Sequence, residues 1–237
     1  MIATTMEDHI VVCGLGNVGI RVVQHLRRMN EEVVCIESDG EGRFLQEVEG
    51  AQVPVLIGDC RVVKTLEGAN IDKAKAVICV TNNDLTNPEA ALTARELNPK
   101  IRVVMRMFDQ KLAKKIEKFL GIDGCYSSSA RSSRLFAQAA ISSDILDSFE
   151  FAGTVINAVQ IEVEPNMPIV GETVDDLRNK HEVTILLHEQ VDGVVDWNPA
   201  PSNVLRVGDK LLIMTDPDGI KRLESATKPL LLPKSER

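Results

Sequence analysis

The sequence predicts an α/β protein in which a doubly wound parallel sheet is followed by a small α+β domain. Over residues 9–126, short runs of β-branched residues alternate with segments that have helical spacing. The runs are continuously apolar, which is expected when helices cover both faces of a parallel sheet. The composition changes after Phe151, and seven of the ten prolines lie beyond residue 160. A chain of 237 residues is long enough for two domains, each with its own core.

The first predicted domain, residues 1–128, is of the Rossmann type because six β/α units follow one another. Six apolar runs are its predicted strands: His9–Cys13, Glu32–Glu37, Val53–Ile57, Ala76–Val80, Ile101–Met105 and Gly124–Tyr126. The segments between them are its predicted helices: Asn17–Met29, Gly42–Glu49, Arg61–Glu67, Asp84–Leu97 and Asp109–Leu120.

A long helical stretch is predicted next, from Ser129 to about Phe149. Its apolar side is broader than packing against its own domain requires. This side includes Leu135, Phe136, Ala139, Ala140, Ile145, Leu146 and Phe149. We therefore expect residues 129–151 to be linker helices that form a subunit or domain interface. The alternative is a helix that packs on its own sheet.

Residues 152–227 form the second predicted domain, and residues 228–237 are expected to be a flexible tail. The domain is β-rich and has two short helices. Its predicted elements are strands Thr154–Val163, Val183–His188, Val194–Val195 and Lys210–Met214 and helices Val174–Asn179 and Asp218–Ser225.

Charge and composition exclude several classes of protein. The net charge is −8, and it divides into −3 for residues 1–150 (18 basic, 21 acidic) and −5 for residues 151–237 (9 basic, 14 acidic). Neither part has the basic excess that nucleic-acid binding needs. No apolar run approaches the ~20 residues of a membrane helix, and the N-terminus does not resemble a signal peptide. We therefore expect a cytoplasmic chain without direct membrane insertion.

The cysteines do not indicate a disulfide framework or a metal site. There are five of them, an odd number, and no CxxC pair occurs. Most lie in or beside apolar runs, so we interpret them as small buried side chains in a reducing compartment.

A glycine motif carries the strongest functional signal. Gly14, Gly16 and Gly19 have G-x-G-x-x-G spacing, directly after an apolar strand and at the start of an amphipathic helix. Gly14 permits the tight turn, Gly16 lets a pyrophosphate approach the backbone, and Gly19 lets helix and strand pack closely. The N-terminus of the helix then offers N–H groups to phosphates.

An acidic residue ends the second predicted strand. Glu37 lies 21 residues after Gly16, where a carboxylate can accept hydrogen bonds from both ribose hydroxyls of an adenosine. It would repel a 2′-phosphate. Ser38 and Asp39 follow with no arginine, so NADP is disfavoured as a ligand.

Three further positions follow predicted strands, at the edge where such sheets bind ligands. Gly58, Asp59 and Cys60 are placed to contact adenine, Thr81–Asp84 to line the far end of the nucleotide, and Arg106 to meet a phosphate or the second ribose. Each of them could instead cap the next helix, for which Asn83 or Asp84 is well suited. The residues alone leave both readings open.

The sequence offers few groups for catalysis. His9, His25, His181 and His188 have no metal-ligand spacing, and neither a G-x-S-x-G motif nor a Walker A lysine occurs. No acid or base is evident beside a nicotinamide. We therefore expect a protein that binds a nucleotide without transforming it, with no catalytic residue and no metal.

Several of these motifs together resemble the RCK domain, also called KTN or TrkA-N, which regulates potassium channels and Trk/Ktr potassium transporters. The resemblance rests on GLGNVG, Glu37, GDC (58–60), VTNND (80–84), residues 91–109 and GID (121–123). Residues 163–187 and 204–223 resemble its small C-terminal companion, TrkA-C or RCK-C. The resemblance covers about residues 8–225.

The resemblance implies a cytosolic regulatory subunit or domain that gates a potassium channel or transporter by ligand-dependent rearrangement of an RCK ring. It implies homo-oligomers, from a dimer to a ring of four or eight copies, at the inner face of the cell membrane. The alternative is an NAD-dependent oxidoreductase with a small accessory domain.

The motifs and the resemblance together define the expected ligand and its contacts. NAD(H) is favoured, with ATP, ADP or AMP as further ligands. Some relatives have an arginine at the position of Asn17 that reads the terminal phosphate of ATP, and calcium-gated relatives have carboxylates at the positions of Arg106 and Phe108. The expected contact residues are Gly14, Leu15, Gly16, Asn17, Val18, Gly19, Glu37, Ser38, Asp59, Cys60, Thr81, Asn82 and Arg106.

Overall fold

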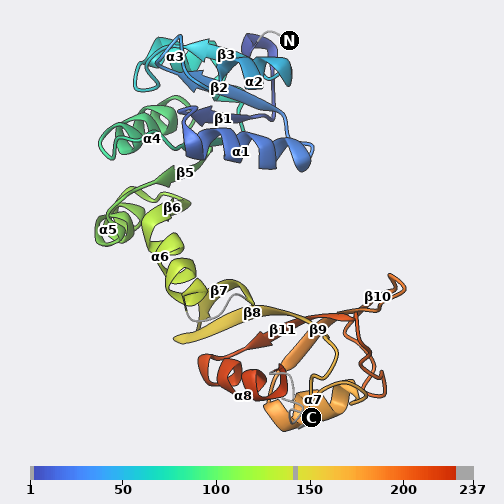
Figure 1. Cartoon of the computed structure of the whole chain (residues 1–237). Helices are drawn as coiled ribbons and strands as arrows, with labels where there is room; N and C mark the ends of the chain where they lie inside the picture. The colour runs from blue at the N-terminus through green and yellow to red at the C-terminus, as the bar shows by residue number, and fades with distance from the viewer. Residues whose placement is uncertain (1–2, 141–143, 228–237) are drawn as a thin grey trace. The chain divides into compact units, whose positions relative to one another are not determined.

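The computed structural model describes residues 3–140 and 144–227. By its internal contacts the chain divides into two compact units, residues 1–131 and residues 132–237, and each is described by itself. Figure 1 labels the helices and strands of both units.

The first unit contains a six-stranded sheet in the order β3-β2-β1-β4-β5-β6, in which all neighbouring strands are parallel. The order reverses between β1 and β4, where the chain moves from one half of the sheet to the other. The predicted Rossmann-type, doubly wound sheet is therefore confirmed. The strands are β1 (Ile10–Cys13), β2 (Val33–Glu37), β3 (Val55–Ile57), β4 (Ala76–Cys79), β5 (Arg102–Arg106) and β6 (Gly124–Tyr126).

Helices cover both faces of this sheet. One core cluster joins the sheet to the helices that follow β3, β4 and β5, and a second joins the opposite face to the helices that follow β1 and β2. Val11 and Val12 belong to different clusters because successive side chains of a strand point to opposite faces. The helices are α1 (Asn17–Arg28), α2 (Leu45–Gly50), α3 (Val63–Gly68), α4 (Thr86–Leu97) and α5 (Gln110–Leu120).

Local signals set the ends of α5. Asp109 precedes it, and Oδ1 of Asp109 accepts hydrogen bonds from the N–H groups of Lys111 (2.7 Å) and Leu112 (3.0 Å). Gly121 ends it in the left-handed region at φ 58°. These are the capping residues that helix ends favour, so the sequence predicts both ends to within one residue.

The predicted helix from Ser129 to Phe149 is wrong in its second half. Helix α6 spans Ser128–Ala139, but Ile145–Phe151 is a strand, β7, that pairs antiparallel with β8 (Thr154–Glu162). A two-residue turn joins them, with Ala152 at φ 50° and Gly153 at φ 81°. Two successive positive φ angles match the twist of a hairpin, which explains why the chain reverses here.

Parts of that predicted helix fall outside the described chain. Residues 141–143 are not described, nor are the side chains of Leu135 and Ala139. Among the other apolar positions, Phe136 is 76% exposed, and Leu146 and Phe149 are also exposed.

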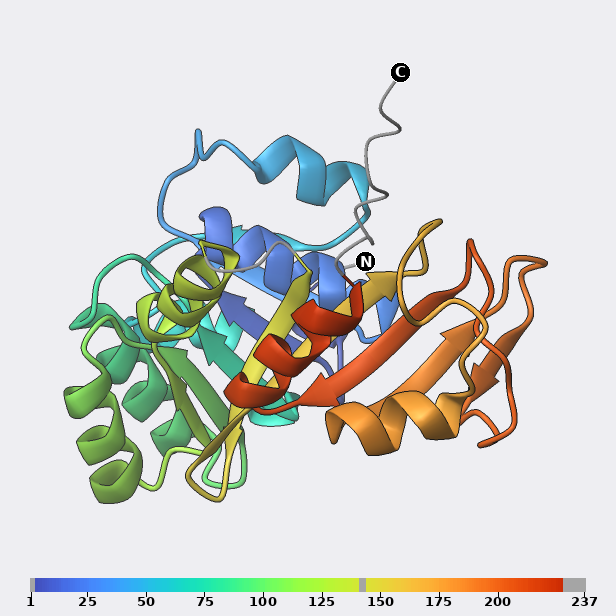
Figure 2. The same cartoon turned by 60° about the horizontal axis from the view of Figure 1, so that its bottom comes forward.

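The second unit is a five-stranded antiparallel sheet in the order β10-β9-β11-β8-β7. Its remaining elements are α7 (Val174–His181), β9 (Thr184–Glu189), β10 (Val195–Trp197), β11 (Lys210–Thr215) and α8 (Pro217–Thr227). Helix α7 packs on β9, and α8 packs on β8 and β11, so both lie on the same side of the sheet (Figure 2). The buried residues between them include Ile161, Leu177, Ile185 and Ile213. The predicted α+β character of this part is confirmed.

All five cysteines are free, and four of them (Cys13, Cys35, Cys60 and Cys79) are buried in the first unit. Within residues 3–140 and 144–227, no helix has both the length and the apolar character that crossing a membrane requires.

Candidate functional site

A cavity of about 880 Å³ lies at the carboxyl ends of the strands of the first unit. It extends from the loops after β3 and β2, across the glycine loop, to the ends of β4 and β5. Of the expected contact residues, every one except Gly19 lines it: Gly14, Leu15, Gly16, Asn17, Val18, Glu37, Ser38, Asp59, Cys60, Thr81, Asn82 and Arg106. The fold thus brings residues from the carboxyl ends of five strands, or from the loops after them, to one site.

The three motif glycines have different surroundings. Gly14 has φ +95°, and a Cβ there would lie 3.0 Å from the backbone of Thr81. A Cβ on Gly19 would lie 2.0 Å from the carbonyl oxygen of Gly14, so Gly19 serves helix packing rather than the cavity. Nothing lies within 4 Å of the Cβ position of Gly16. A ligand can therefore approach the backbone at Gly16 and the uncapped start of α1.

Glu37 links the glycine loop to the turn after β2. Its Oε2 accepts a hydrogen bond from the N–H of Leu15 (2.6 Å). Its Oε1 accepts from the N–H groups of Ser38 (2.7 Å) and Asp39 (3.0 Å) and from the Ser38 hydroxyl (3.1 Å). The carboxylate is held in place before any ligand arrives, and Oε2, with one partner, can accept a further hydrogen bond.

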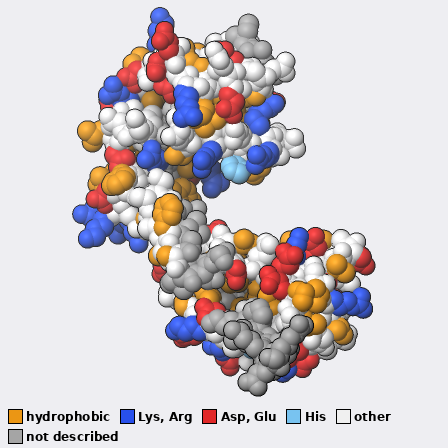
Figure 3. All heavy atoms as spheres, viewed as in Figure 1, with side chains coloured by type: hydrophobic (Ala, Val, Ile, Leu, Met, Phe, Trp, Pro, Cys, Tyr) orange, Lys and Arg blue, Asp and Glu red, His pale blue; other side chains and the backbone are white. Residues whose placement is uncertain are grey.

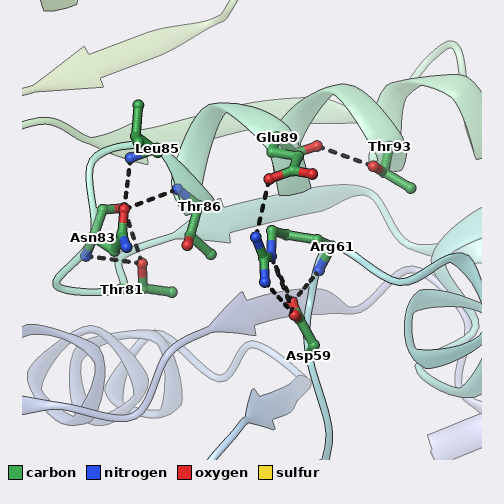
Figure 4. Close-up of polar contacts among 8 residues, drawn as sticks. All are labelled: Asp59, Arg61, Thr81, Asn83, Leu85, Thr86, Glu89 and Thr93. Atoms are coloured by element: carbon green, nitrogen blue, oxygen red, sulfur yellow. Dashed lines mark hydrogen bonds and ion pairs between the residues drawn. The ribbon is translucent and has the colours of Figure 1, made fainter.

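Asp59 belongs to an ion-pair network that the sequence does not predict (Figure 4). The guanidinium of Arg61 bonds the Asp59 carboxylate through Nε and Nη2, and its Nη1 reaches Glu89 of α4 at 3.3 Å. The side-chain and backbone N–H groups of Arg61 lower the pKa of Asp59 below its ordinary value. The same carboxylates raise the pKa of Arg61. Asp59 is therefore held as an anion beside the cavity.

Asn87 organises the far end of the cavity and is missed by the sequence analysis. It is completely buried, and its Oδ1 accepts from the N–H (3.0 Å) and hydroxyl (2.7 Å) of Thr81. Its Nδ2 donates to the carbonyl oxygens of Thr81 (3.2 Å) and Arg106 (3.0 Å). A polar residue on the same helix face as Ala90, Ala91 and Ala94 is the sequence signal that would have found it.

The two readings of the VTNND segment can now be separated by residue. Asn83 does both: its Oδ1 accepts hydrogen bonds from the N–H groups of Leu85 (2.8 Å) and Thr86 (3.3 Å) at the start of α4 (Figure 4), and the residue also lines the cavity. Asp84 accepts from the N–H of Phe108 (2.6 Å) and so holds the loop after β5. Asn82 is exposed and lines the cavity.

Arg106 reaches the cavity from the end of β5. Its Nη1 lies 3.4 Å from the carbonyl oxygen of Thr81, and its Nε is buried with no hydrogen-bond partner in the described chain. A buried donor without a partner has a free-energy cost that a ligand oxygen can remove.

The expectation that no arginine follows Glu37 in the site is wrong. Arg43, six residues after Glu37, lines the same cavity. Arg61 lines it as well.

Among the described residues, no group of three or more histidine, cysteine, aspartate or glutamate side chains is arranged to hold a metal ion.

Family comparison covers both units. Residues 10–128 match the TrkA-N domain and residues 158–228 match the TrkA-C domain.

Three curated relatives illustrate the range of similar proteins. "Probable potassium channel protein 2" of Methanocaldococcus jannaschii is 26% identical over an alignment of 240 positions, which covers 94% of this chain and 68% of that protein. "Potassium channel protein 1" of the same organism is 26% identical over an alignment of 229 positions, which covers 92% of this chain and 66% of that protein. A "Trk system potassium uptake protein TrkA homolog" of Pyrococcus abyssi is 35% identical over 101 residues, 43% of this chain and 44% of that protein.

Solved structures share the fold at low sequence identity. The GsuK channel has a TM-score of 0.65 and 17% identity over 98% of this chain and 41% of that one. The GsuK channel bound to NAD has a TM-score of 0.60 and 16% identity, and the match covers 96% of this chain and 41% of that one. GsuK bound to ADP has a TM-score of 0.50 and 16% identity, and the match covers 60% of this chain and 36% of that one. The chain thus spans about two thirds of the two channel proteins and less than half of each of these solved chains.

Proposed function

Because the chain belongs to the family defined by the TrkA-N and TrkA-C domains, we propose that it is a nucleotide-binding regulatory subunit or domain that gates a potassium channel or transporter. The cavity is the observation that carries this proposal. It gathers the glycine loop, Glu37, Asp59, Thr81 and Arg106 at one edge of a parallel sheet. The relatives named for potassium channels and Trk uptake support the transport system as the target.

We propose NAD(H) as the favoured ligand, with ADP, ATP or AMP as alternatives. A volume of about 880 Å³ lies within the range of small-ligand sites. The pyrophosphate would lie at Gly16 and the start of α1, the adenosine ribose at Glu37, and the other end of the ligand near Thr81 and Arg106. The NAD and ADP complexes of GsuK support both ligand types.

NADP should bind more weakly than NAD. Glu37 and Asp39 both line the adenosine end of the cavity, and two carboxylates there repel a 2′-phosphate. Arg43 adds one positive charge at this end, so the discrimination is expected to be smaller than the acidic residues alone would produce.

Regulation follows from differential affinity. A nucleotide can shift the arrangement of the domains only if it binds one arrangement more tightly than the other. We propose that the chain assembles as a dimer and then as a ring, which transmits this preference to the pore. Exposed apolar side chains include Phe108 and Phe119 in the first unit and Phe136 in α6. Figure 3 shows Lys and Arg side chains close to hydrophobic ones on the part of the first unit that carries α5.

Calorimetry of the full chain with NAD, ADP and NADP tests the ligand, and a panel of carbonyl substrates with NADH tests for catalysis. We expect NAD or ADP to bind, NADP to bind more weakly, and NADH not to be consumed. Robust steady-state oxidation of NADH would favour the alternative, an NAD-dependent oxidoreductase. Absence of binding by both NAD and ADP would overturn the nucleotide-sensing role.

A further inference from the structure

Arg43 is carried to the cavity by two consecutive turns between β2 and α2. The N–H of Gly42 donates to the carbonyl oxygen of Asp39, and the N–H of Leu45 donates to that of Gly42, each at 3.1 Å. The Asp39 carboxylate also accepts from the N–H of Glu41 at 2.9 Å. These bonds return the chain toward the sheet edge, so the position of Arg43 follows from the backbone of the loop.

Arg43 differs from the other two arginines that line the cavity. Arg61 is neutralised by Asp59 and Glu89, and Arg106 lies against the carbonyl oxygen of Thr81. Within residues 3–140 and 144–227, the guanidinium of Arg43 forms neither a hydrogen bond nor an ion pair. The carboxylates of Glu37 and Asp39 also line the cavity, but the hydrogen bonds that they accept come from backbone N–H groups and not from Arg43.

The contact that Arg43 does make is with an aromatic ring. Its guanidinium carbon lies 5.2 Å from the centroid of the Phe44 ring, within the range of a cation–π contact, and Phe44 also lines the cavity. A guanidinium is planar and weakly hydrated, so it stacks on flat π systems in a way that an ammonium group does not.

The surrounding charge favours a neutral group over a phosphate at this position. Glu37, at the end of β2, and Asp39, in the same β2–α2 segment as Arg43, also line the cavity, and a phosphate placed between these two carboxylates would be repelled by both. A purine base carries no charge and is not repelled. This end of the cavity is also the one at which Glu37 would hold the adenosine ribose.

We propose that Arg43 is the base-recognition residue of the cavity, and that its guanidinium stacks on the purine ring of an adenine nucleotide. The inference rests on the proposed nucleotide-binding function and adds to it a contact that selects for the base. Part of the binding free energy of the nucleotide would then come from its adenine ring and would not depend on the phosphates at the glycine loop.

Calorimetry with NAD, ADP and NADP on the full chain and three variants tests this assignment. Arg43→Ala removes the planar cation, and Arg43→Lys keeps the charge without the plane. Arg28→Ala is the matched control, because Arg28 is an exposed arginine at the end of α1 and does not line the cavity. Thermal unfolding of each variant verifies that the first unit remains folded.

We expect Arg43→Ala to weaken NAD and ADP alike, by about 3-fold to 20-fold, which is the scale of a cation–π contact. Arg43→Lys should lose most of the same affinity, and Arg28→Ala should match the wild type. NADP should lose affinity by at least the same factor as NAD, because the positive charge of Arg43 also offsets the repulsion of its 2′-phosphate.

Two results would overturn the assignment while leaving nucleotide binding intact. In the first, Arg43→Ala binds NAD and ADP as tightly as the wild type does. In the second, the variant loses affinity for NADP alone and lysine restores it, which would make Arg43 a reader of a ribose phosphate. A wild-type chain that binds neither NAD nor ADP would instead overturn the proposed function, and the stacking role with it.

Discussion

At the scale of single residues, the cavity depends on side chains whose hydrogen bonds are made to the backbone. The Glu37 carboxylate accepts hydrogen bonds from the N–H groups of Leu15, Ser38 and Asp39. The Asn87 side chain forms hydrogen bonds with backbone groups of Thr81 and Arg106. Such contacts hold two loops in a fixed geometry, so a ligand meets groups that are already oriented.

Replacement of Glu37 should weaken adenosine ligands selectively. Glu37→Ala removes the ribose acceptor, and we expect NAD and ADP to lose about 1–3 kcal/mol of binding free energy, the scale of hydrogen bonds to a charged group. NADP should lose less, because repulsion of its 2′-phosphate is removed at the same time. Calorimetry measures both effects. Equal losses for NAD and NADP would contradict the role of Glu37 in excluding the 2′-phosphate.

Asn87 and Asn82 provide a matched pair that separates stability from binding. Asn87→Ala removes four hydrogen bonds to part-buried groups of Thr81 and Arg106, so we expect the free energy of unfolding to fall by about 2–4 kcal/mol. Asn82→Ala, at an exposed position, should leave stability unchanged and weaken NAD. Urea denaturation and calorimetry measure the two quantities. A stable Asn87→Ala variant would show that water replaces the lost hydrogen bonds.

At the scale of secondary-structure elements, the six residues Gly14–Gly19 at the start of α1 provide both close packing and an approach for the ligand. Gly19 lies against the backbone of Gly14, whereas Gly16 faces open space. The two glycines therefore have different reasons to lack a side chain, and alanine at each should have a different effect.

Gly19→Ala should destabilise the first unit by at least about 2 kcal/mol, because its Cβ would lie 2.0 Å from the Gly14 carbonyl oxygen and α1 must move. Gly16→Ala should fold normally and bind NAD at least about tenfold more weakly, because a methyl group would occupy the approach to the backbone. Thermal unfolding and calorimetry distinguish the two. Tight NAD binding by Gly16→Ala would place the pyrophosphate elsewhere.

A buried pair joins β9 to the loop before β11 and should make the second unit sensitive to acid. His188 and Asp209 are each 1% exposed, and His188 Nε2 lies 2.8 Å from Asp209 Oδ2. Burial raises the pKa of Asp209, but hydrogen bonds from the N–H of Arg206, from His188 and from the N–H of Val191 lower it by more, so its pKa lies below the ordinary value.

A carboxyl group whose pKa is lower in the folded chain stabilises the fold above its unfolded pKa of about 3.9. That contribution is lost as the pH falls through the lower pKa of the folded state. We expect peptides of β8, β9 and β11 to lose protection from hydrogen exchange below about pH 4. Asp209→Asn should be less stable at neutral pH and lose less on acidification, whereas Asp175→Asn, at an exposed position, should behave as the wild type. An unchanged acid profile in Asp209→Asn would refute the role of this pair.

At the scale of the whole molecule, the exposed apolar side chains of the first unit and of α6 indicate association between copies. Phe136 in α6 is 76% exposed and Phe119 in α5 is 82% exposed, which is unusual for phenylalanine at a free surface. We propose that α6 contributes to the dimer interface, as the sequence analysis expects for this region.

Phe136→Glu should raise the dissociation constant of the dimer about tenfold or more, because it would place an unpaired carboxylate in an apolar contact. Light scattering at micromolar concentration measures the mass. Gln46→Glu is the control, since it adds the same charge at an exposed position of α2. A wild-type chain that is strictly monomeric under these conditions would contradict the interface.

The sequence by itself determined the features that depend on local pattern and backbone geometry. The six parallel strands appear as continuous apolar runs, Asp109 and Gly121 mark the ends of α5, and the glycine spacing locates the loop between β1 and α1. Residues 145–151 form a strand and not the predicted helix. A short apolar pattern is compatible with either element, and here the pairing with β8 stabilises the strand.

Only the tertiary structure decided which side chains share the cavity and what each already bonds. Arg61 and Glu89 are 28 residues apart, and Arg106 reaches Thr81 from another strand, so no sequence spacing relates them. Arg43 reaches the cavity because of the turns in its loop. Asn87 can hold the loops after β4 and β5 only because α4 buries it beneath the ends of these two strands. Hydrogen bonds and ion pairs act over a few ångströms in space, and the packing of α3, α4 and the strand ends sets those distances.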